Sequence, residues 1–174
     1  AASLLTRSAD LSIADIGELC GSEHCCILLT DTKKRKCSIF AESLREGSNL
    51  FPMSHYIDGF YPITETWPNT LAGSTCVIVK DESDMEKLRD QNPIWGASLE
   101  QAGIKTIVLF PLRHGGVVLG YMWALNFNVA DVMKIKETLE VTTFFLASEI
   151  ASYQLLNELE IMITIDSLTG VKIA

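Results

Sequence analysis

Cysteine offers the most chemistry of any residue type in this sequence, because a thiolate can bind a metal or attack an electrophile. No two cysteines form a C-x-x-C pair, and the densest cluster is the run His24-Cys25-Cys26. That run lies in an apolar, strand-like stretch, where neighbouring side chains point to opposite faces of a sheet. We therefore expect no metal site and no catalytic residue there, and interpret the cysteines as buried thiols: Cys20, Cys25, Cys26, Cys37 and Cys76.

A second group of side chains suited to binding lies between residues 43 and 74, where Gly, Pro, Ser and Asn alternate with large rings. Small-molecule sites are mostly apolar with a few polar groups, so these rings are candidate walls of a ligand pocket. Rings in irregular segments also commonly plug the edge of a sheet, which is the competing interpretation. The candidate ligand-binding residues are Phe51, His55, Tyr56, Phe60, Tyr61, Trp67, Cys76 and Trp95. The ligand and any cofactor stay unknown at this stage.

Composition limits the classes of partner. The 174 residues are 48% hydrophobic, with a formal charge of -8 and a pI near 4.8. This charge gives no basic field for nucleic acid or an anionic membrane surface. No apolar run reaches the roughly 20 residues that span a bilayer, and the N-terminus lacks the order of a signal peptide. With an odd number of cysteines, these features predict a cytoplasmic location.

The elements that would position these residues follow from hydrophobic periodicity. Apolar residues at spacings of three and four predict a helix over residues 4–20, and Gly21 ends it. Apolar runs predict strands at 24–30, 36–42, 75–80, 104–112 and 117–127. We expect further helices from residue 81, over 94–102 and from about 129 to 165, with an irregular segment over 43–74. This order predicts an α+β fold with an antiparallel sheet.

Two segments carry a resemblance to a known family. Residues 102–112 end in Pro111-Leu112, and after a glycine turn Val117 to Met122 pass through the step Leu119-Gly120. Together they resemble the central hairpin of GAF domains, and residues 21–29 resemble the first strand of that family. The resemblance spans residues 4 to about 157, so we assign residues 1–157 to a GAF-like domain. It implies a five- or six-stranded antiparallel sheet with helices on one face and a loop-covered ligand pocket on the other.

The end of the chain resembles a different family. The sequence Asp166-Ser167-Leu168-Thr169-Gly170-Val171 is similar to the turn that opens GGDEF diguanylate cyclase domains. That family continues with Asn-Arg where this chain has Ile173-Ala174, and a simple helix end capped by Gly170 is the alternative. The expected turn residues are Asp166, Leu168, Thr169 and Gly170, within a linker and output segment at 158–174. The GGDEF signature is absent from these residues, so we expect no enzyme activity in them and a cyclase in the full-length protein.

The resemblance leaves the ligand open. Members of the family that bind cyclic nucleotides carry a dispersed sequence pattern, which this chain matches at Asn126 and at most also at Asp131. Members that attach a bilin use a Cys that is usually followed by His, whereas Cys76 is followed by Val77. The residues therefore favour neither ligand. The alternative function is a redox enzyme of the free methionine sulfoxide reductase type, which shares the GAF fold and would use Cys76 as its nucleophile. No histidine partner for Cys76 is evident in the sequence.

The last helix carries two apolar stripes. The first, Val132, Ile135, Leu139, Leu146 and Ile150, is expected to face the sheet. Beyond it the apolar positions are Leu155, Leu156, Leu159, Met162 and Ile163. A stripe that extends past its own core predicts a second helix, so we expect a homodimer through a short coiled coil. The sequence thus predicts a small-molecule sensor that dimerises and controls a diguanylate cyclase.

Overall fold

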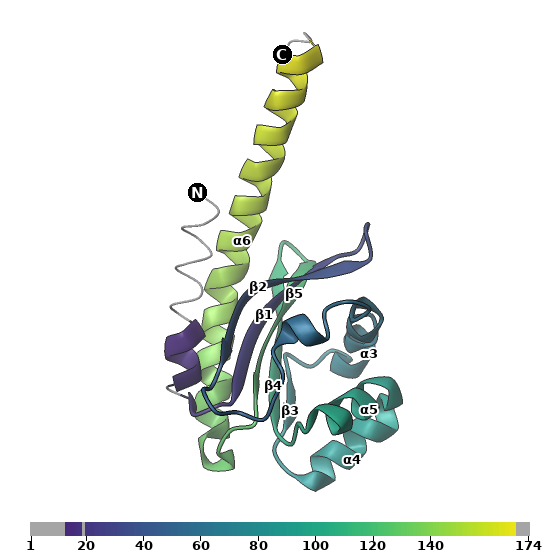
Figure 1. Cartoon of the computed structure of the whole chain (residues 1–174), viewed down its shortest axis with the longest axis vertical. Helices are drawn as coiled ribbons and strands as arrows, with labels where there is room; N and C mark the ends of the chain where they lie inside the picture. The colour runs from purple at the N-terminus through teal and green to yellow at the C-terminus, as the bar shows by residue number, and fades with distance from the viewer. Residues whose placement is uncertain (1–12, 19, 170–174) are drawn as a thin grey trace.

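The computed structural model describes residues 13–18 and 20–169, in which one antiparallel sheet separates two unlike layers (Figure 1). The long helix α6 (Val132–Thr169) lies along one face of the sheet and extends well beyond it (Figure 1). Three helices gather on the opposite side: α3 (Trp67–Leu71), α4 (Glu82–Gln91) and α5 (Pro93–Ala102). Among the described residues, no helix combines the length and the hydropathy needed to cross a bilayer.

The sheet has five strands in the order β2-β1-β5-β4-β3, all paired antiparallel. Both hairpin turns have a local cause. The Asp31 carboxylate accepts the backbone N–H groups of Lys33 and Lys34, each at 3.0 Å, and so closes the β1–β2 turn. Gly115 and Gly116 both have positive φ, at 58° and 77°, as the tight β4–β5 turn requires. The strands, which confirm the predicted set, are β1 His24–Asp31, β2 Lys36–Leu44, β3 Val77–Val79, β4 Ile107–His114 and β5 Val117–Leu125.

The segment predicted to be irregular, residues 43–74, holds more structure than expected. It contains η1 Met53–His55, α2 Tyr61–Thr64 and α3 Trp67–Leu71. Pro62 and Pro68 occupy the first turns of α2 and α3, where the missing N–H costs nothing, so these prolines start helices instead of breaking them. The prediction of an irregular segment was therefore wrong over these residues.

Side-chain caps fix the next two helices. Asp81 accepts the backbone N–H of Asp84 at 2.8 Å and begins α4 Glu82–Gln91. Asn92 accepts the backbone N–H of Trp95 at 3.1 Å and begins α5 Pro93–Ala102, which Gly103 ends in the left-handed conformation. Helix α5 then packs into the second core through its buried Trp95 and Leu99 side chains.

The terminal segments are only partly described. Residues 13–18 and 20 are helical, in agreement with the predicted first helix, and the rest of that prediction lies outside the described residues. After η2 Val129–Asp131, helix α6 runs from Val132 to Thr169. The turn predicted at Asp166, Leu168 and Thr169 is therefore part of the helix, and Gly170 lies outside the described residues.

Alternation along the strands creates two hydrophobic cores, one on each face of the sheet. On β5, Met122 and Ala124 face α6, while Tyr121 and Trp123 face the opposite layer. The α6 core confirms the predicted first stripe, since all five of its residues pack there: Val132, Ile135, Leu139, Leu146 and Ile150. The second core combines aliphatic side chains with a cluster of aromatic rings that includes Trp67, Trp95 and Trp123, and it contains the pocket described next.

Candidate ligand pocket

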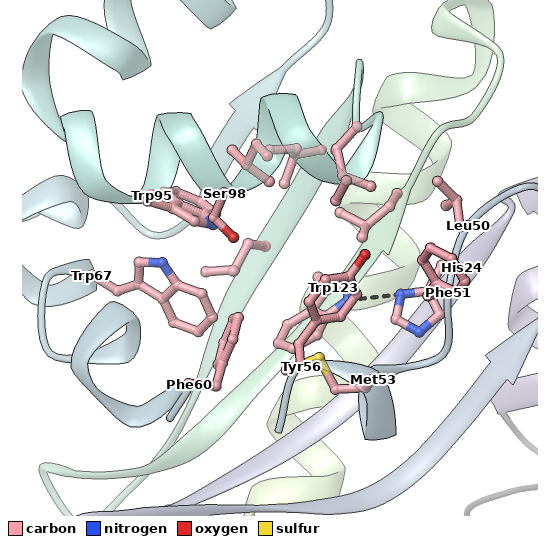
Figure 2. Close-up of a pocket in the computed structure, with 16 residues that line it drawn as sticks. His24, Leu50, Phe51, Met53, Tyr56, Phe60, Trp67, Trp95, Ser98 and Trp123 are labelled. Atoms are coloured by element: carbon pink, nitrogen blue, oxygen red, sulfur yellow. Dashed lines mark hydrogen bonds between the residues drawn. The ribbon is translucent and has the colours of Figure 1, made fainter. Parts of the chain in front are cut away.

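A pocket opens between the sheet and the layer formed by η1, α3 and α5. Figure 2 shows aromatic side chains from several separate elements converging on it. The rings leave a cavity of only about 60 Å³, so a ligand of more than a few non-hydrogen atoms requires some of them to move. Its aromatic walls are Phe51, Tyr56, Phe60, Trp67, Trp95 and Trp123.

The indole of Trp67 is the centre of this aromatic cluster. Its ring centroid lies 4.7 Å from that of Tyr121 and 5.3 Å from that of Trp95, both in tilted or edge-to-face arrangements. Such geometry places the positive edge of one ring against the negative face of another. Only 1% of Trp67 is exposed, yet its Nε1 has no hydrogen-bond partner within the described part of the chain. The cluster therefore contains one buried donor that the protein itself does not satisfy.

Trp123 is placed differently, because its indole N–H donates to His24 Nδ1 at 3.2 Å (Figure 2). An indole nitrogen can only donate, so Nδ1 of His24 must accept and its proton must sit on Nε2. That Nε2–H donates to Glu42 Oε2 at 2.6 Å. The contact fixes a neutral His24 facing an ionised Glu42.

Glu42 also ties the sheet to the segment that covers the pocket. Its Oε2 accepts the backbone N–H of Met53, in η1, at 2.6 Å. Burial opposes ionisation of this carboxyl, but the hydrogen bonds from His24 and Met53 outweigh burial and lower the pKa of Glu42. The chain from Trp123 through His24 and Glu42 to Met53 thus links the pocket floor to its cover.

His24, Cys26 and Glu42 offer three metal-ligand atoms that all lie within 4.8 Å of one another. They do not suit a metal ion as arranged. Binding through His24 Nε2 would move the histidine proton to Nδ1, where it would meet the N–H of Trp123. Burial, with the charge of Glu42 adding to it, also raises the pKa of the Cys26 thiol well above its ordinary value, whereas a metal needs the thiolate.

The cover of the pocket is the segment from Leu50 to Tyr56. Phe51 is 58% exposed and stacks on His55 at a centroid distance of 4.4 Å. The buried Met53 side chain and the Glu42 to Met53 hydrogen bond anchor this segment, while its exposed rings contribute little burial. The cover is the part of the wall that a ligand could most readily displace.

A polar groove adjoins the pocket and shares the Leu50, Phe51 and Tyr56 side chains with it. Arg45 pairs there with Glu23 at 3.0 Å. Asn126, which matched the cyclic-nucleotide pattern, has a positive φ of 55° and accepts the backbone N–H of Lys105 at 2.7 Å. Its amide also donates to Glu23 and to the Gly103 carbonyl, so Asn126 holds the strand end in place.

Of the eight residues predicted to contact a ligand, the structure brings five together. They are Phe51, Tyr56, Phe60, Trp67 and Trp95, and their contact with a ligand stays a prediction.

Three of the eight do not line the pocket. His55 lies outside Phe51, and Tyr61 packs under the Arg35 guanidinium, 5.8 Å from its ring centroid. Cys76 packs against the core on the α6 side, and burial raises the pKa of its thiol. Cys76 therefore has neither the position nor the lowered pKa that the alternative redox function needs.

Sequence reasoning missed His24, Met53, Ser98 and Trp123, which also line the pocket. His24 and Trp123 lie in strands that read as uniformly apolar, and their adjacency depends on the β1–β5 register, which pairs Cys26 with Trp123. Strict alternation along β5 could have indicated that Tyr121 and Trp123 share one face of the sheet.

Comparisons with models of known protein families and with curated proteins find no match. Solved structures do match. GAF3 of Synechocystis sp., in its photoproduct state, superposes with a TM-score of 0.63 at 12% identity, over 91% of this chain and 99% of that chain. The phycoerythrobilin-bound GAF domain of a cyanobacterial phytochrome gives 0.59 at 16% identity, over 88% of each chain. The GAF domain of the Acinetobacter phosphoenolpyruvate-protein phosphotransferase gives 0.56 at 13% identity, over 88% of this chain and 86% of that chain.

At such identities the similarity concerns the fold. The strand order, the long helix on one face and the pocket on the other agree with the architecture expected from the central hairpin. The chain has the fold of a GAF domain.

Proposed function

We propose that this chain is the regulatory part of a cytoplasmic signalling protein, which binds a small molecule and controls a C-terminal diguanylate cyclase. The observation that carries the proposal is the arrangement on the two faces of the sheet. A ring-lined pocket lies on one face, and on the other lies a helix that continues past the domain. Phycoerythrobilin in one structural neighbour supports the use of this fold for ligand binding.

Dimerisation through α6 is the second part of the proposal. The five side chains of the predicted stripe are each between 45% and 61% exposed. Exposed apolar side chains of α6 also occur before the predicted stripe, among them Val141 and Phe145. Alternating spacings of four and three residues, the repeat of a coiled coil, connect these positions to the predicted stripe. The positions are Val141, Phe145, Ser148, Ser152, Leu155, Leu159 and Met162.

A homodimer would bury this stripe against its copy. Burying a large aliphatic side chain contributes about 1.5–3 kcal/mol relative to exposure, so several together favour pairing of the two helices. A ligand would then act by binding one arrangement of the pair better than another, with a typical coupling of about 1–3 kcal/mol. The α6 contact with β4 and β5 provides the path from the sheet to the helix.

The dimer is tested by Leu159→Glu, which places two like charges in the seam of a symmetric pair. Asn157→Glu is the matched control, since it adds the same charge to an exposed position outside the stripe. Sedimentation should show a dimer for the wild type and for Asn157→Glu, and a monomer for Leu159→Glu. A monomeric wild type at high concentration, or a dimeric Leu159→Glu variant, contradicts this part of the proposal.

Control of a cyclase rests on the similarity of residues 166–171 to the start of GGDEF domains. The test is to assay the product of the intact gene for conversion of GTP to cyclic di-GMP, in the wild type and in both charge variants. We expect Leu159→Glu to lose most activity and Asn157→Glu to keep it. Absence of cyclic di-GMP from the wild-type product would contradict the cyclase assignment while leaving the sensor fold unaffected.

A further inference from the structure

The buried indole N–H of Trp67 indicates what kind of ligand the pocket suits. Leaving a buried donor without an acceptor is unfavourable, and native proteins have few such groups. Figure 2 shows the nitrogen edge of Trp67 turned toward Trp95 and the Ser98 hydroxyl, at the side of the pocket formed by α5. Nε1 is fully buried, so a ligand atom that accepts a hydrogen bond there must first displace neighbouring rings, and it would then satisfy a donor that the described residues leave unpaired.

We propose that the pocket binds an uncharged aromatic or conjugated molecule whose carbonyl oxygen or ring nitrogen accepts a hydrogen bond from Trp67 Nε1. This inference rests on the proposed sensory function and names the class of its ligand.

The walls select a flat, apolar body. Trp67, Trp95 and Trp123 are each at most 4% exposed and present ring faces and edges to the cavity. A planar ring suits these walls because aromatic pairs prefer offset or edge-to-face contacts, although the wall rings must move to enlarge the cavity of about 60 Å³. The exposed Phe51 at the cover is the ring that can move to admit it.

The charges around the pocket disfavour an anion. No lysine or arginine from the described part of the chain lines the pocket. Glu42 lies directly behind His24 and is ionised, so a carboxylate ligand would be buried near a like charge. The cations Arg45 and Lys105 lie in the neighbouring polar groove instead.

A protonated donor on the ligand is disfavoured as well. The indole N–H cannot accept a hydrogen bond, and Oε2 of Glu42 already accepts hydrogen bonds from His24 and Met53. The ligand group facing Trp67 must therefore be a neutral acceptor.

Three probes of similar shape separate these possibilities: acetophenone, α-methylstyrene and benzoate. All three carry a phenyl ring. Acetophenone adds a neutral hydrogen-bond acceptor, α-methylstyrene has no acceptor in that place, and benzoate carries a negative charge. In the purified wild-type chain, titration should give the tightest binding for acetophenone, with α-methylstyrene about fivefold weaker for want of one neutral hydrogen bond. Benzoate should bind more weakly than acetophenone.

The wild-type chain also provides a direct spectroscopic readout. Its three tryptophans give three indole N–H signals in a ¹⁵N–¹H spectrum. Acetophenone should move the Trp67 indole proton downfield, while α-methylstyrene should not. This measurement does not depend on any variant folding correctly.

Trp67→Phe then keeps a ring and removes the donor, and Trp95→Phe serves as the matched control. We expect acetophenone and α-methylstyrene to bind Trp67→Phe with equal affinity, and the fivefold preference to persist in Trp95→Phe. Equal affinities in the wild type, a preference for benzoate, or no binding of any probe would each overturn the inference. The dimer and cyclase experiments do not use these probes, so a failure here is distinguishable from a failure of the proposed function.

Discussion

The sheet face under α6 is packed mainly by aliphatic side chains, whereas the opposite face also carries a cluster of aromatic rings with a cavity between them. Ile135, Leu139 and Ile150 have no exposed surface and pack directly on the strands. Trp67 and Trp123 are almost as buried, yet a cavity of about 60 Å³ lies between them and their neighbours.

The two faces also treat polar groups differently. The ring-lined face buries the Trp123, His24 and Glu42 network, and the described residues leave its Trp67 donor unpaired. An aliphatic face can fill space closely because its side chains interlock, while large rigid rings fill it only in particular arrangements. The α6 face thus suits a permanent contact between the helix and the sheet, and the ring-lined face suits the binding and release of a ligand.

The largest effect is expected where a single substitution disturbs both faces at once. A Cβ at Gly120, in β5, would lie 2.0 Å from the carbonyl oxygen of Leu28 on the neighbouring strand. Backbone atoms within a sheet cannot move aside, so Gly120→Ala should lower the free energy of unfolding by about 4 kcal/mol or more. Urea unfolding measures it. Gly17→Ala is the control, because its nearest neighbour is the movable Ser43 hydroxyl at 3.2 Å, and equal effects would contradict the expectation.

A smaller loss should follow from truncating one face only. Leu139→Ala removes a fully buried side chain from the closed α6 face and should lower the free energy of unfolding by about 3 kcal/mol. Leu109→Ala makes the same change at a residue that lines the pocket, where some packing contacts are already missing. We expect a cost of about 2 kcal/mol there, by the same urea measurement. A larger cost at Leu109 would show that the pocket face is as closely packed as the other.

The Glu42 network gives the ring-lined face a dependence on pH. The pKa of Glu42 in the folded chain is lowered from its ordinary value of 4.5, so its ionised form adds stability that is fully present above pH 4.5. That contribution is lost as pH falls through the folded pKa. Glu42→Gln should therefore cost about 1 kcal/mol at pH 7, with the difference from wild type shrinking below pH 4.5. A difference that stays constant across that range would show that ionisation of Glu42 is not involved.

Much of the fold could be predicted from the sequence because its signals are local. Apolar runs separated by Gly115-Gly116 or by the turn from Asp31 specify hairpins without reference to the rest of the chain. The prolines of α2 and α3 misled the prediction, since the same residue breaks a helix in its middle and begins one at its first turn.

The pocket was predictable only in part, because it depends on contacts between distant residues. The rings of residues 51–67 were recognisable from composition alone. The Trp123 to His24 hydrogen bond joins residues 99 positions apart and requires the register of β1 against β5. Cys76 was placed on the wrong face because it lies just before β3, whose three residues are too few for alternation to be recognised.

The smallest effect on stability is expected at the centre of the ring cluster, with Trp67→Phe. Loss of ring area weakens the packing, but removal of a buried N–H without a partner relieves a cost of about 1–3 kcal/mol. The two changes oppose each other, so the free energy of unfolding should stay within about 1 kcal/mol of the wild type. Trp123→Phe is the matched control, because the same change there also deprives His24 Nδ1 of its donor and should cost about 1–2 kcal/mol more. Urea unfolding of both variants checks this, and equal losses would mean that the Trp67 N–H is satisfied in solution and that the pocket presents no free donor to a ligand.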